Sequence, residues 1–415
     1  MEFDLLIFDL DNTLLRTDAV AHFRGAEFVD QQPLKYRDSL ITHARASVTP
    51  IYPQTFFEAL KRAHPQLRIG ILTRAPRAYL DVLLTLFYPR FAFDATVAAR
   101  EVAHPKPAPD GIREIARRTG TTDASRVAVI GDDKVDLQAA YRAGVWMVSE
   151  ESAWPVKLQF DQYAMLERMP DARIKGPADL MPFLQSRVEH LPLMEAWAVE
   201  GKAPCTARPP RIEAINHFDR TSEKRAPVRI QVLGRRFRDD DDDKHRRAWH
   251  RLSMDIESLK NAETFPDYWI GTLRAALTEK ARFAKGNHAV VTVVPAKPGR
   301  EPRLEHLLAQ LAQSHRDTPI RARDRQVLSF KPDVFAYLDG VRSHHGEYLN
   351  AAERFANVRD HFKVVNPTLV AGRSFIVLDD VTTSGATLFY AHHYLVDNGA
   401  ASVILLSFTK AVSAQ

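Results

Sequence analysis

The sequence has only one cysteine, Cys205, among its 415 residues. A single cysteine cannot form a disulfide within the chain, so the fold does not depend on an oxidising compartment. No uninterrupted apolar run reaches the roughly 18 residues that a membrane-spanning helix needs. The start, MEFDLLIFDLDNTLL, has carboxylates inside its apolar stretch and no basic segment before it, so we expect no signal peptide. We therefore expect a soluble, cytoplasmic protein without a membrane partner.

Glycine is also scarce, at 17 residues, and proline, at 25, is near its usual share, which excludes a collagen-like or low-complexity chain. A chain of 415 residues is longer than one hydrophobic core usually serves, so we expect two domains. The formal net charge of +5 would favour phosphorylated small molecules or nucleic acid as partners. In the charged stretch 235–251, basic residues flank Asp239–Asp243. We predict a solvated loop or ribbon there, with nucleic-acid binding as the alternative.

Residues 1–187 alternate short apolar strands with amphipathic helices, which is the order of a parallel α/β sheet. We expect strands at Leu5–Phe8, Ile69–Leu72, Ala92–Val97 and Val127–Ile130, and helices at Thr55–Ala63, Ala78–Leu86, Pro109–Thr119 and Pro177–Arg187. After Gly144 the pattern weakens. Residues 188–225 carry several prolines and no sustained period, so we predict a linker there.

Residues 226–412 return to α/β order. We expect strands at Val228–Leu233, His288–Val294, Phe375–Leu378 and Ser402–Phe408, a helical stretch at Ala248–Phe283 that breaks near Pro266, and helices at Arg303–Ser314 and after Ser384. The two halves share a layer type but no repeated motif. The sequence therefore predicts two α/β domains, 1–187 and 226–412.

Acidic and polar side chains follow the predicted strands of the first half. They are Asp9, Asp11, Thr73, Asp132, Asp133 and Asp136, and Lys106 lies in a loop between them. The carboxyl ends of parallel strands meet at one edge of the sheet, where open α/β sheets bind their ligands. One carboxylate there can attack a phosphorus atom while another exchanges a proton with the leaving oxygen. So many carboxylates would repel one another without a divalent cation, and oxygen ligands indicate Mg²⁺.

These motifs resemble the haloacid dehalogenase (HAD) superfamily of phosphohydrolases over residues 1–187. The resemblance implies a Rossmann-like fold in which Asp9 is the nucleophile that forms an aspartyl-phosphate and Asp11 is the general acid/base. It implies that Thr73 and Lys106 bind the transferring phosphoryl group. The metal ligands that we carry over are Asp9, Asp11, Asp132 and Asp136, with the Leu10 carbonyl. Acidic turns without catalysis are the alternative.

In that family, substrate choice usually comes from a cap inserted after the first motif. Here the interval from Thr17 to about Pro50 leaves room only for a small cap. An open site would suit bulky or varied phosphate esters, including nucleotides, polynucleotides or a phosphoprotein.

A hydroxyl-rich loop is the most informative feature of the second half, where residues 374–387 read SFIVLDDVTTSGAT. A hydrophobic strand ends in paired carboxylates and is followed by a loop and a helix. Backbone N–H groups at such a helix start bind phosphate, and the carboxylates can accept hydrogen bonds from ribose hydroxyls. The candidate residues are Asp379, Asp380, Thr382, Thr383, Ser384, Gly385, Ala386 and Thr387.

This stretch resembles the phosphoribosyl-pyrophosphate (PRPP) signature of the type I phosphoribosyltransferases. With residues 353–364 before it, the domain is similar to the competence-protein F (ComF) branch of that family over about 226–412. The resemblance implies a type I phosphoribosyltransferase fold with a hood, and a pyrophosphate loop in which Lys297, Arg300 and Arg303 are candidates. A nucleotide-binding strand, loop and helix without transferase activity is the alternative.

The sequence thus predicts a bifunctional enzyme, a Mg²⁺-dependent phosphatase joined to a PRPP-dependent transferase that acts on nucleotide or ribose-phosphate substrates. One alternative is a phosphatase whose second domain is a non-catalytic sensor of PRPP or a nucleotide. Another is a phosphatase that processes nucleic-acid ends. Homo-oligomerisation is a further option that the sequence leaves open.

Overall fold

The computed structural model describes residues 2–25, 33–204, 209–218, 221, 224–240, 242–321, 326–342 and 349–413. Cys205 lies outside them. The chain divides into two compact units, of which unit 1 contains residues 1–190, 237–250 and 413–415, and unit 2 contains 191–236 and 251–412. The chain therefore leaves unit 2 after Arg236, contributes a segment to unit 1, and returns to unit 2 at Arg251.

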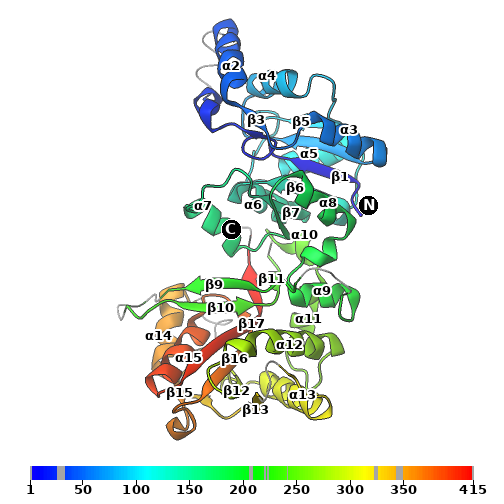
Figure 1. Ribbon diagram of the computed structural model, residues 1–415. Coiled ribbons are helices and arrows are strands. Elements are labelled where there is room, and N and C mark those ends of the chain that lie inside the picture. The colour runs from blue at the N-terminus through cyan, green and yellow to red at the C-terminus, as the bar shows by residue number, and fades with distance from the viewer. Residues whose placement is uncertain are drawn as a thin grey trace. The chain divides into compact units, whose positions relative to one another are not determined.

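Unit 1 is built on a six-stranded sheet with the order β5-β4-β1-β6-β7-β8, in which every described pairing is parallel (Figure 1). Its strands are β1 (Leu5–Phe8), β4 (Arg68–Leu72), β5 (Ala95–Val97), β6 (Val127–Gly131), β7 (Trp146–Glu150) and β8 (Ala172–Ile174). β1 and β6 are buried at every position, as expected of central strands with helices on both faces. Because β1 lies between β4 and β6, the residues that follow these three strands meet at one edge.

Most helices of unit 1 connect these strands; α8 follows the last of them, and α10 comes from the segment 237–250. The helices are α3 (Gln54–Ala63), α4 (Arg77–Phe87), α5 (Asp110–Thr119), α6 (Lys134–Ala143), α7 (Phe160–Glu167), α8 (Pro177–Gln185) and α10 (Lys244–Arg247), with the 3₁₀ turns η2 (Ala124–Arg126) and η3 (Arg187–His190). On α5 the buried positions Gly111, Ile112 and Ile115 share the face that packs on the sheet.

A small helical region follows β1, in the interval where the sequence predicts a small cap. It consists of η1 (Asp18–Arg24) and α2 (Pro33–Ser47), bracketed by the antiparallel pair β2 (Leu15–Arg16) and β3 (Thr49–Pro50). The Phe23 ring packs edge-on against the ring of Tyr36, 5.8 Å between centroids, and both side chains are buried. α2 also lies beside α4 (Figure 1), so this region rests on the sheet domain.

Unit 2 has a second sheet of seven strands, with the order β13-β12-β16-β17-β10-β9 and with β11 paired to β17. The strands are β9 (Glu213–His217), β10 (Val228–Val232), β11 (Arg235–Phe237), β12 (His288–Val293), β13 (Val327–Phe330), β16 (Ser374–Thr382) and β17 (Ser402–Val412). A separate antiparallel pair joins β14 (Phe335–Tyr337) to β15 (Phe362–Val364). β9 pairs antiparallel with β10 at the edge, whereas β12, β16 and β17 are parallel neighbours in the centre.

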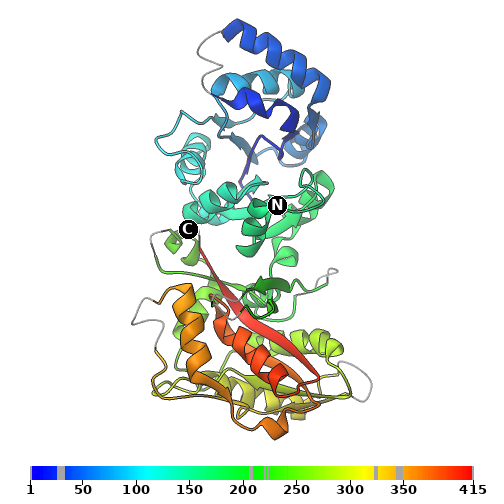
Figure 2. The ribbon, with the colours of Figure 1, turned by 90° about the vertical axis from the view of Figure 1, so that its left-hand side faces the viewer.

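The helices of unit 2 are α9 (Leu193–Glu200), α11 (Arg251–Ser258), α12 (Asp267–Lys280), α13 (Arg303–Asp317), α14 (Ala351–His361) and α15 (Ala386–Asp397), with the turns η4 (Ala281–Phe283) and η5 (Pro367–Leu369). α14 and α15 lie side by side (Figure 2). The ring of Phe355 meets that of Phe389 between them, with 5.3 Å between centroids. Within the described part of the chain, no helix combines the length and apolarity needed to cross a bilayer.

The sequence predicted a linker at 188–225. The structure instead has the helix α9 and the strand β9 in this segment. Glu195 on α9 is buried and accepts hydrogen bonds from the backbone N and the Nε of Arg235, at 2.7 and 2.8 Å. Pro192 is the residue directly before the first turn of α9, so its missing N–H removes no hydrogen bond from the helix. α9 and β9 are therefore folded elements of unit 2.

The charged stretch 235–251 is only in part the solvated loop or ribbon that the sequence predicts, because it contains β11 and α10 and buries Arg246. Arg246 is fully buried, pairs with the buried Asp171, and lies 3.8 Å from the ring centroid of Trp249 and 4.7 Å from that of Trp146. Alternating charges led us to expect exposure, but the neighbouring tryptophans supply apolar cover for a paired cation. Arg235, Arg236, Arg246 and Arg247 pair with carboxylates of this chain, whereas Arg238 and Lys244 are exposed.

Candidate active site

Asp9 leaves the centre of the sheet at the point where β1 ends. Its backbone N donates to the Ile130 carbonyl at 2.8 Å, which continues the β1–β6 ladder and places Asp9 beside the residues that follow β6. Asp9, Asp132 and Asp136 each offer a carboxylate oxygen, and the three oxygens lie within 4.8 Å of one another. The structure thus brings together three of the acidic residues that the sequence singled out.

Lys106 completes this group from the loop between β5 and α5. Its buried ammonium donates to Asp9, to Asp136 Oδ1 at 2.6 Å and to the Leu72 carbonyl at 3.0 Å. Burial disfavours the charged ammonium, but the carboxylates of Asp136 and Asp9 outweigh it and raise the pKa of Lys106 above its ordinary value. Lys106 is therefore a fixed cation at the carboxyl ends of β1 and β4.

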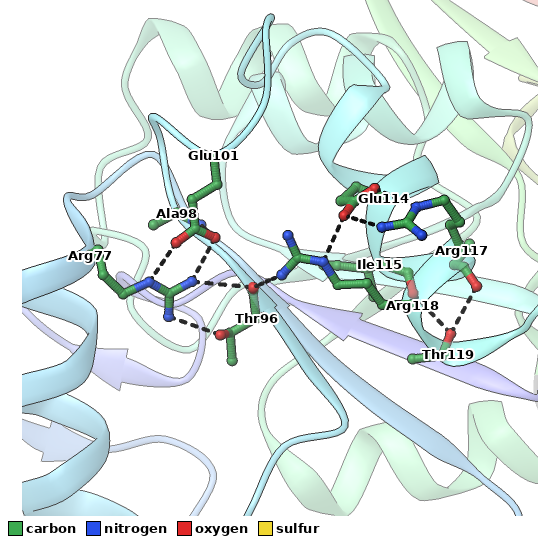
Figure 3. Close-up of polar contacts among 10 residues, drawn as sticks. Arg77, Thr96, Ala98, Glu101, Glu114, Ile115, Arg117, Arg118 and Thr119 are labelled. Atoms are coloured by element: carbon green, nitrogen blue, oxygen red, sulfur yellow. Dashed lines mark hydrogen bonds and ion pairs between the residues drawn. The ribbon is translucent and has the colours of Figure 1, made fainter.

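The loop that carries Lys106 is anchored by a polar cluster at its start (Figure 3). Arg77, at the beginning of α4, donates through Nε and Nη2 to the two carboxylate oxygens of Glu101, each at 2.6 Å. It also donates through Nη1 to Thr96 Oγ1 on β5 at 2.9 Å, and Arg118 on α5 donates to the Thr96 carbonyl at 2.9 Å. The strand end, the loop and two helices are thereby tied together ahead of Lys106.

The acidic group has the electrostatics of a site for a divalent cation. Burial raises the pKa of Asp136 to about 7, with a further contribution from Asp9, although Lys106 opposes it. Burial followed by the charges of Asp9 and Asp136 raises the pKa of Asp132 well above its ordinary value. Three carboxylates face one ammonium, so a cation bound by these oxygens would relieve the remaining repulsion. The donor set, oxygen atoms only, fits Mg²⁺.

Gly131 makes the close approach of Asp136 feasible. A Cβ at this position would lie 2.5 Å from the Asp136 carboxyl carbon, nearer than any side chain tolerates. Asp136 Oδ2 in turn accepts the backbone N–H of Asp133 at 3.2 Å at the start of α6. The glycine before the two aspartates is therefore a packing requirement of the site.

Asp11 lies apart from the three candidate ligands and has a different set of partners. Its Oδ1 accepts hydrogen bonds from Thr17 Oγ1 at 2.7 Å and Tyr79 OH at 2.9 Å, and pairs with Arg24 Nη2 at 3.0 Å. Burial raises the pKa of Asp11 above its ordinary value, against the opposing charge of Arg24. A raised pKa suits a carboxyl that donates a proton, but this position outside the group of three does not support the prediction that Asp11 is a metal ligand.

Thr73 is buried at the end of β4, as its place in the sequence predicts. Its backbone N donates to the Val97 carbonyl at 3.0 Å, and its Oγ1 accepts the Ala75 N–H at 3.0 Å. Since Lys106 bonds to the adjacent Leu72 carbonyl, Thr73 and Lys106 stand at the same strand end.

Sequence reasoning missed several residues of this site. Trp154, after β7, donates through Nε1 to the Asp132 carbonyl at 3.0 Å, and Arg24 and Tyr79 contact Asp11. None stands in a motif at a strand end. Tyr79 belongs to the apolar face of a predicted helix and Arg24 to the predicted cap, so only their charge or hydroxyl could have suggested a role.

In unit 2, β16 carries Asp379 and Asp380 toward the predicted phosphate loop. Asp380 Oδ2 pairs with Arg303 Nη2 at 2.8 Å, and the Asp380 N–H donates to Asp379 Oδ1 at 2.9 Å. Burial, then the charge of Asp380, raises the pKa of Asp379 well above its ordinary value. Arg303, which we named among the pyrophosphate-loop candidates, begins α13 and makes this contact.

The loop after β16 turns at Gly385 into α15. Gly385 has a φ of +77°, and a Cβ on it would lie 2.3 Å from His217 Nδ1. His217 on β9 donates through Nδ1 to the Ser384 carbonyl at 3.0 Å, since a carbonyl oxygen only accepts. Thr382 is buried, Thr383 is exposed, and Ala386 and Thr387 begin α15. The predicted strand, loop and helix are thus all present.

The pyrophosphate-loop candidates lie after β12. Lys297 Nζ donates to the Arg342 carbonyl at 2.8 Å and lies 5.7 Å from the centroid of the Tyr337 ring. Arg300 is exposed. Burial raises the pKa of Tyr337, whose hydroxyl also hydrogen-bonds Thr387, so Lys297 is linked through Tyr337 to the start of α15.

Comparison with known proteins identifies unit 1. The family model of the haloacid dehalogenase-like hydrolases matches residues 17–149. The pyrophosphatase PpaX of Bacillus velezensis is 30% identical over 155 residues, which are 35% of this chain and 68% of that protein. The fructose-1-phosphate phosphatase YqaB of Escherichia coli is 26% identical over 174 residues, 34% of this chain and 92% of that protein.

Among solved structures, a hydrolase from Pseudomonas syringae superposes with a TM-score of 0.34 and 20% identity, covering 44% of this chain and 98% of that one. The residues matched by the family model include Asp132 and Asp136, whereas Asp9 lies eight residues before the matched range. By its first unit, the chain belongs to the haloacid dehalogenase-like hydrolases.

Proposed function

We propose that unit 1 is a Mg²⁺-dependent phosphatase that works through an aspartyl-phosphate on Asp9. In the first step, a carboxylate oxygen of Asp9 attacks the phosphorus of a phosphate monoester and the bond from phosphorus to the leaving oxygen breaks. Asp11 gives its proton to that oxygen, so the leaving group departs as a neutral alcohol. Lys106 and Thr73 hold the phosphoryl group while its charge shifts.

In the second step, a water molecule attacks the phosphorus of the aspartyl-phosphate and Asp11, now a carboxylate, takes its proton. The bond between Asp9 and phosphorus breaks, inorganic phosphate leaves, and Asp9 and Asp11 return to their starting states. Asp9, Asp132 and Asp136 would hold Mg²⁺, which neutralises charge on the carboxylates and on the phosphoryl oxygens.

The observation that carries this proposal is the contact of one buried ammonium, Lys106, with both Asp9 and Asp136, beside a separately held Asp11. The two curated relatives, by name a pyrophosphatase and a sugar-phosphate phosphatase, support phosphate compounds as the substrate class. A screen of sugar phosphates, nucleotides and simple esters for phosphate release, with Mg²⁺ or with EDTA, tests it. Release that is equal in EDTA contradicts the metal-dependent mechanism.

We further propose that unit 2 binds PRPP and is a phosphoribosyltransferase, which would make the protein bifunctional. The support is local: the paired carboxylates of Asp379 and Asp380 lie in the last four residues of the central strand β16, and the loop after it leads into a helix at Gly385. Helix N–H groups and loop hydroxyls would bind the 5′-phosphate, and the carboxylates the ribose hydroxyls. Both units would then accept phosphorylated ribose compounds.

One pair of substitutions distinguishes a sensor role of unit 2 from a transferase role. The variant with Asp379→Asn and Asp380→Asn should lose PRPP binding in titration calorimetry while phosphate release on simple esters continues. If PRPP changes the phosphatase rate of the unsubstituted protein, the variant loses that response, and no panel of acceptors yields a ribosylated product, the sensor role replaces the transferase role.

A further inference from the structure

Three donors converge on a single oxygen of Asp11. Thr17, Tyr79 and Arg24 all contact Oδ1, at 2.7, 2.9 and 3.0 Å, and none of the described residues donates to Oδ2. Thr17 and Tyr79 are fully buried, so two of the donors have fixed positions. They come from three different places in the fold: the residue before η1, the last residue of η1 and the first turn of α4.

The direction of each hydrogen bond follows from the groups involved. Arg24 Nη2 also lies 2.8 Å from Thr17 Oγ1, and a guanidinium can only donate, so the Thr17 hydroxyl accepts from Arg24 and gives its own proton to Asp11. Burial and the charge of Asp11 raise the pKa of Tyr79, which keeps its hydroxyl protonated as a donor. Oδ1 is thus saturated with hydrogen-bond donors, and Oδ2 is the oxygen left to meet a substrate.

Arg24 is itself held in place by the helical region after β1. The hydroxyl of Tyr36 on α2 donates to the carbonyl of Phe23 at 2.9 Å, which fixes the residue before Arg24. Asn12 Nδ2 donates to Asp18 Oδ1 at 2.8 Å and ties the start of η1 to the loop after β1. The orientation of the Asp11 carboxyl is therefore coupled to the folding of η1 and α2.

We propose that Arg24, Tyr79 and Thr17 form a clamp that orients the carboxyl of Asp11 with Oδ2 toward the leaving oxygen of the substrate. Arg24 and Tyr79 are positioning residues, because they act through Asp11. The proposal rests on the phosphatase function of unit 1. It gives the small cap a role besides substrate choice, which is to orient the proton donor Asp11.

Leaving groups that differ in basicity provide the test, since an aryl oxide departs without a proton whereas an alkoxide needs one. We would measure kcat/KM for 4-nitrophenyl phosphate and 4-nitrobenzyl phosphate, two esters of similar size, with the full chain in Mg²⁺. Tyr79→Phe and Arg24→Met should lower the value for the benzyl ester by at least about tenfold more than for the phenyl ester. Asp11→Asn removes the proton donor itself, so it should give the largest change in the ratio of the two kcat/KM values.

Matched controls come from the same unit. Tyr88→Phe removes a buried hydroxyl at the other end of α4 that bonds to the Tyr52 carbonyl at 2.8 Å. Arg126→Gln breaks a bidentate pair with Asp4 at the start of β1. Both should leave the ratio of the two esters unchanged, because neither touches Asp11.

An equal loss on both esters in Tyr79→Phe and Arg24→Met, or no loss on either, overturns the clamp while the phosphatase function stands. An unsubstituted protein that hydrolyses neither ester contradicts the phosphatase function, and the clamp with it. A structural role alone would lower both rates together, so the ratio separates positioning from folding.

Discussion

The guanidinium carbon of Arg246 lies 3.8 Å from the centroid of the Trp249 ring, and both residues come from the segment 237–250 that the chain contributes to unit 1. The same guanidinium contacts the buried Asp171 and donates to the Val145 carbonyl at 3.2 Å. Val145 precedes β7, so the segment is held against the central sheet. Unit 1 is therefore assembled from distant parts of the sequence.

Arg246→Ala should destabilise unit 1 strongly, because it leaves the Asp171 carboxylate buried without its cation. Breaking a buried pair in this way costs about 3–5 kcal/mol. Urea unfolding of the full chain, followed by tryptophan fluorescence, measures the change. Arg247→Ala is the matched control, since Arg247 pairs with the exposed Asp239 and should change stability by roughly 0–1 kcal/mol. Equal effects of the two substitutions would contradict the buried role of Arg246.

Lys106→Met should abolish most phosphate release and make the protein depend on Mg²⁺ for stability. Without the ammonium, the carboxylates of Asp9, Asp132 and Asp136 have no compensating charge except a bound cation. Adding Mg²⁺ should therefore raise the melting temperature of this variant more than that of the unsubstituted protein. Lys134→Met, which removes a partly exposed pair with Asp161, should show the ordinary Mg²⁺ response. The account fails here if Mg²⁺ stabilises both variants equally.

Unit 2 should lose stability in mild acid because of His392 on α15. Burial lowers the pKa of His392 from 6.5 to about 4, helped by the neighbouring His393. Between these values the unfolded chain binds a proton that the folded chain does not, so stability falls as the pH drops from 6.5 toward 4. His392→Gln should flatten this part of the profile of urea midpoint against pH. A profile identical to that of the unsubstituted protein would rule His392 out as the cause.

Gly385→Ala should weaken PRPP binding while unit 2 stays folded. A methyl group there would strike His217, whose Nδ1 would lie 2.3 Å from it, and would displace the Ser384 carbonyl that His217 holds. Gly372→Ala is the control, because Gly372 also has a positive φ, +71°, but nothing lies within 4 Å of the added Cβ. Each substitution should cost about 1 kcal/mol of stability through backbone strain. Calorimetric titration with PRPP should show weaker binding for Gly385→Ala alone.

The central strands could be predicted from sequence because they are continuous apolar runs that end in chemically informative residues. Leu5–Phe8, Val127–Gly131 and His288–Val293 appear where they were expected, within a residue or two. β7 was missed, since after Gly144 the apolar run includes Ser149 and Glu150, whose buried partners Met165 and Tyr52 are distant in sequence. β8 and β13 are short strands for which local pattern gives little signal.

The convergence of Asp9, Asp132, Asp136 and Lys106 followed from the rule that parallel strands present their carboxyl ends at one edge. The partners of Asp11 could not be predicted in this way. Tyr79 reaches Asp11 from the side of a helix and Arg24 from a helical turn whose position depends on packing against α2. The burial of Arg246 likewise needed a contact with Asp171 that is distant in sequence. Local sequence patterns identify the candidate catalytic residues, whereas tertiary packing determines which side chains contact them.

The most direct measurement of the central claim is the rate of phosphate release by Asp9→Asn in Mg²⁺, beside the unsubstituted protein. If Asp9 is the nucleophile, the substitution removes the attacking oxygen, and the rate should fall by roughly a thousandfold or more. Circular dichroism and PRPP binding should remain those of the unsubstituted chain. Phosphate release at the full rate by folded Asp9→Asn would contradict the account.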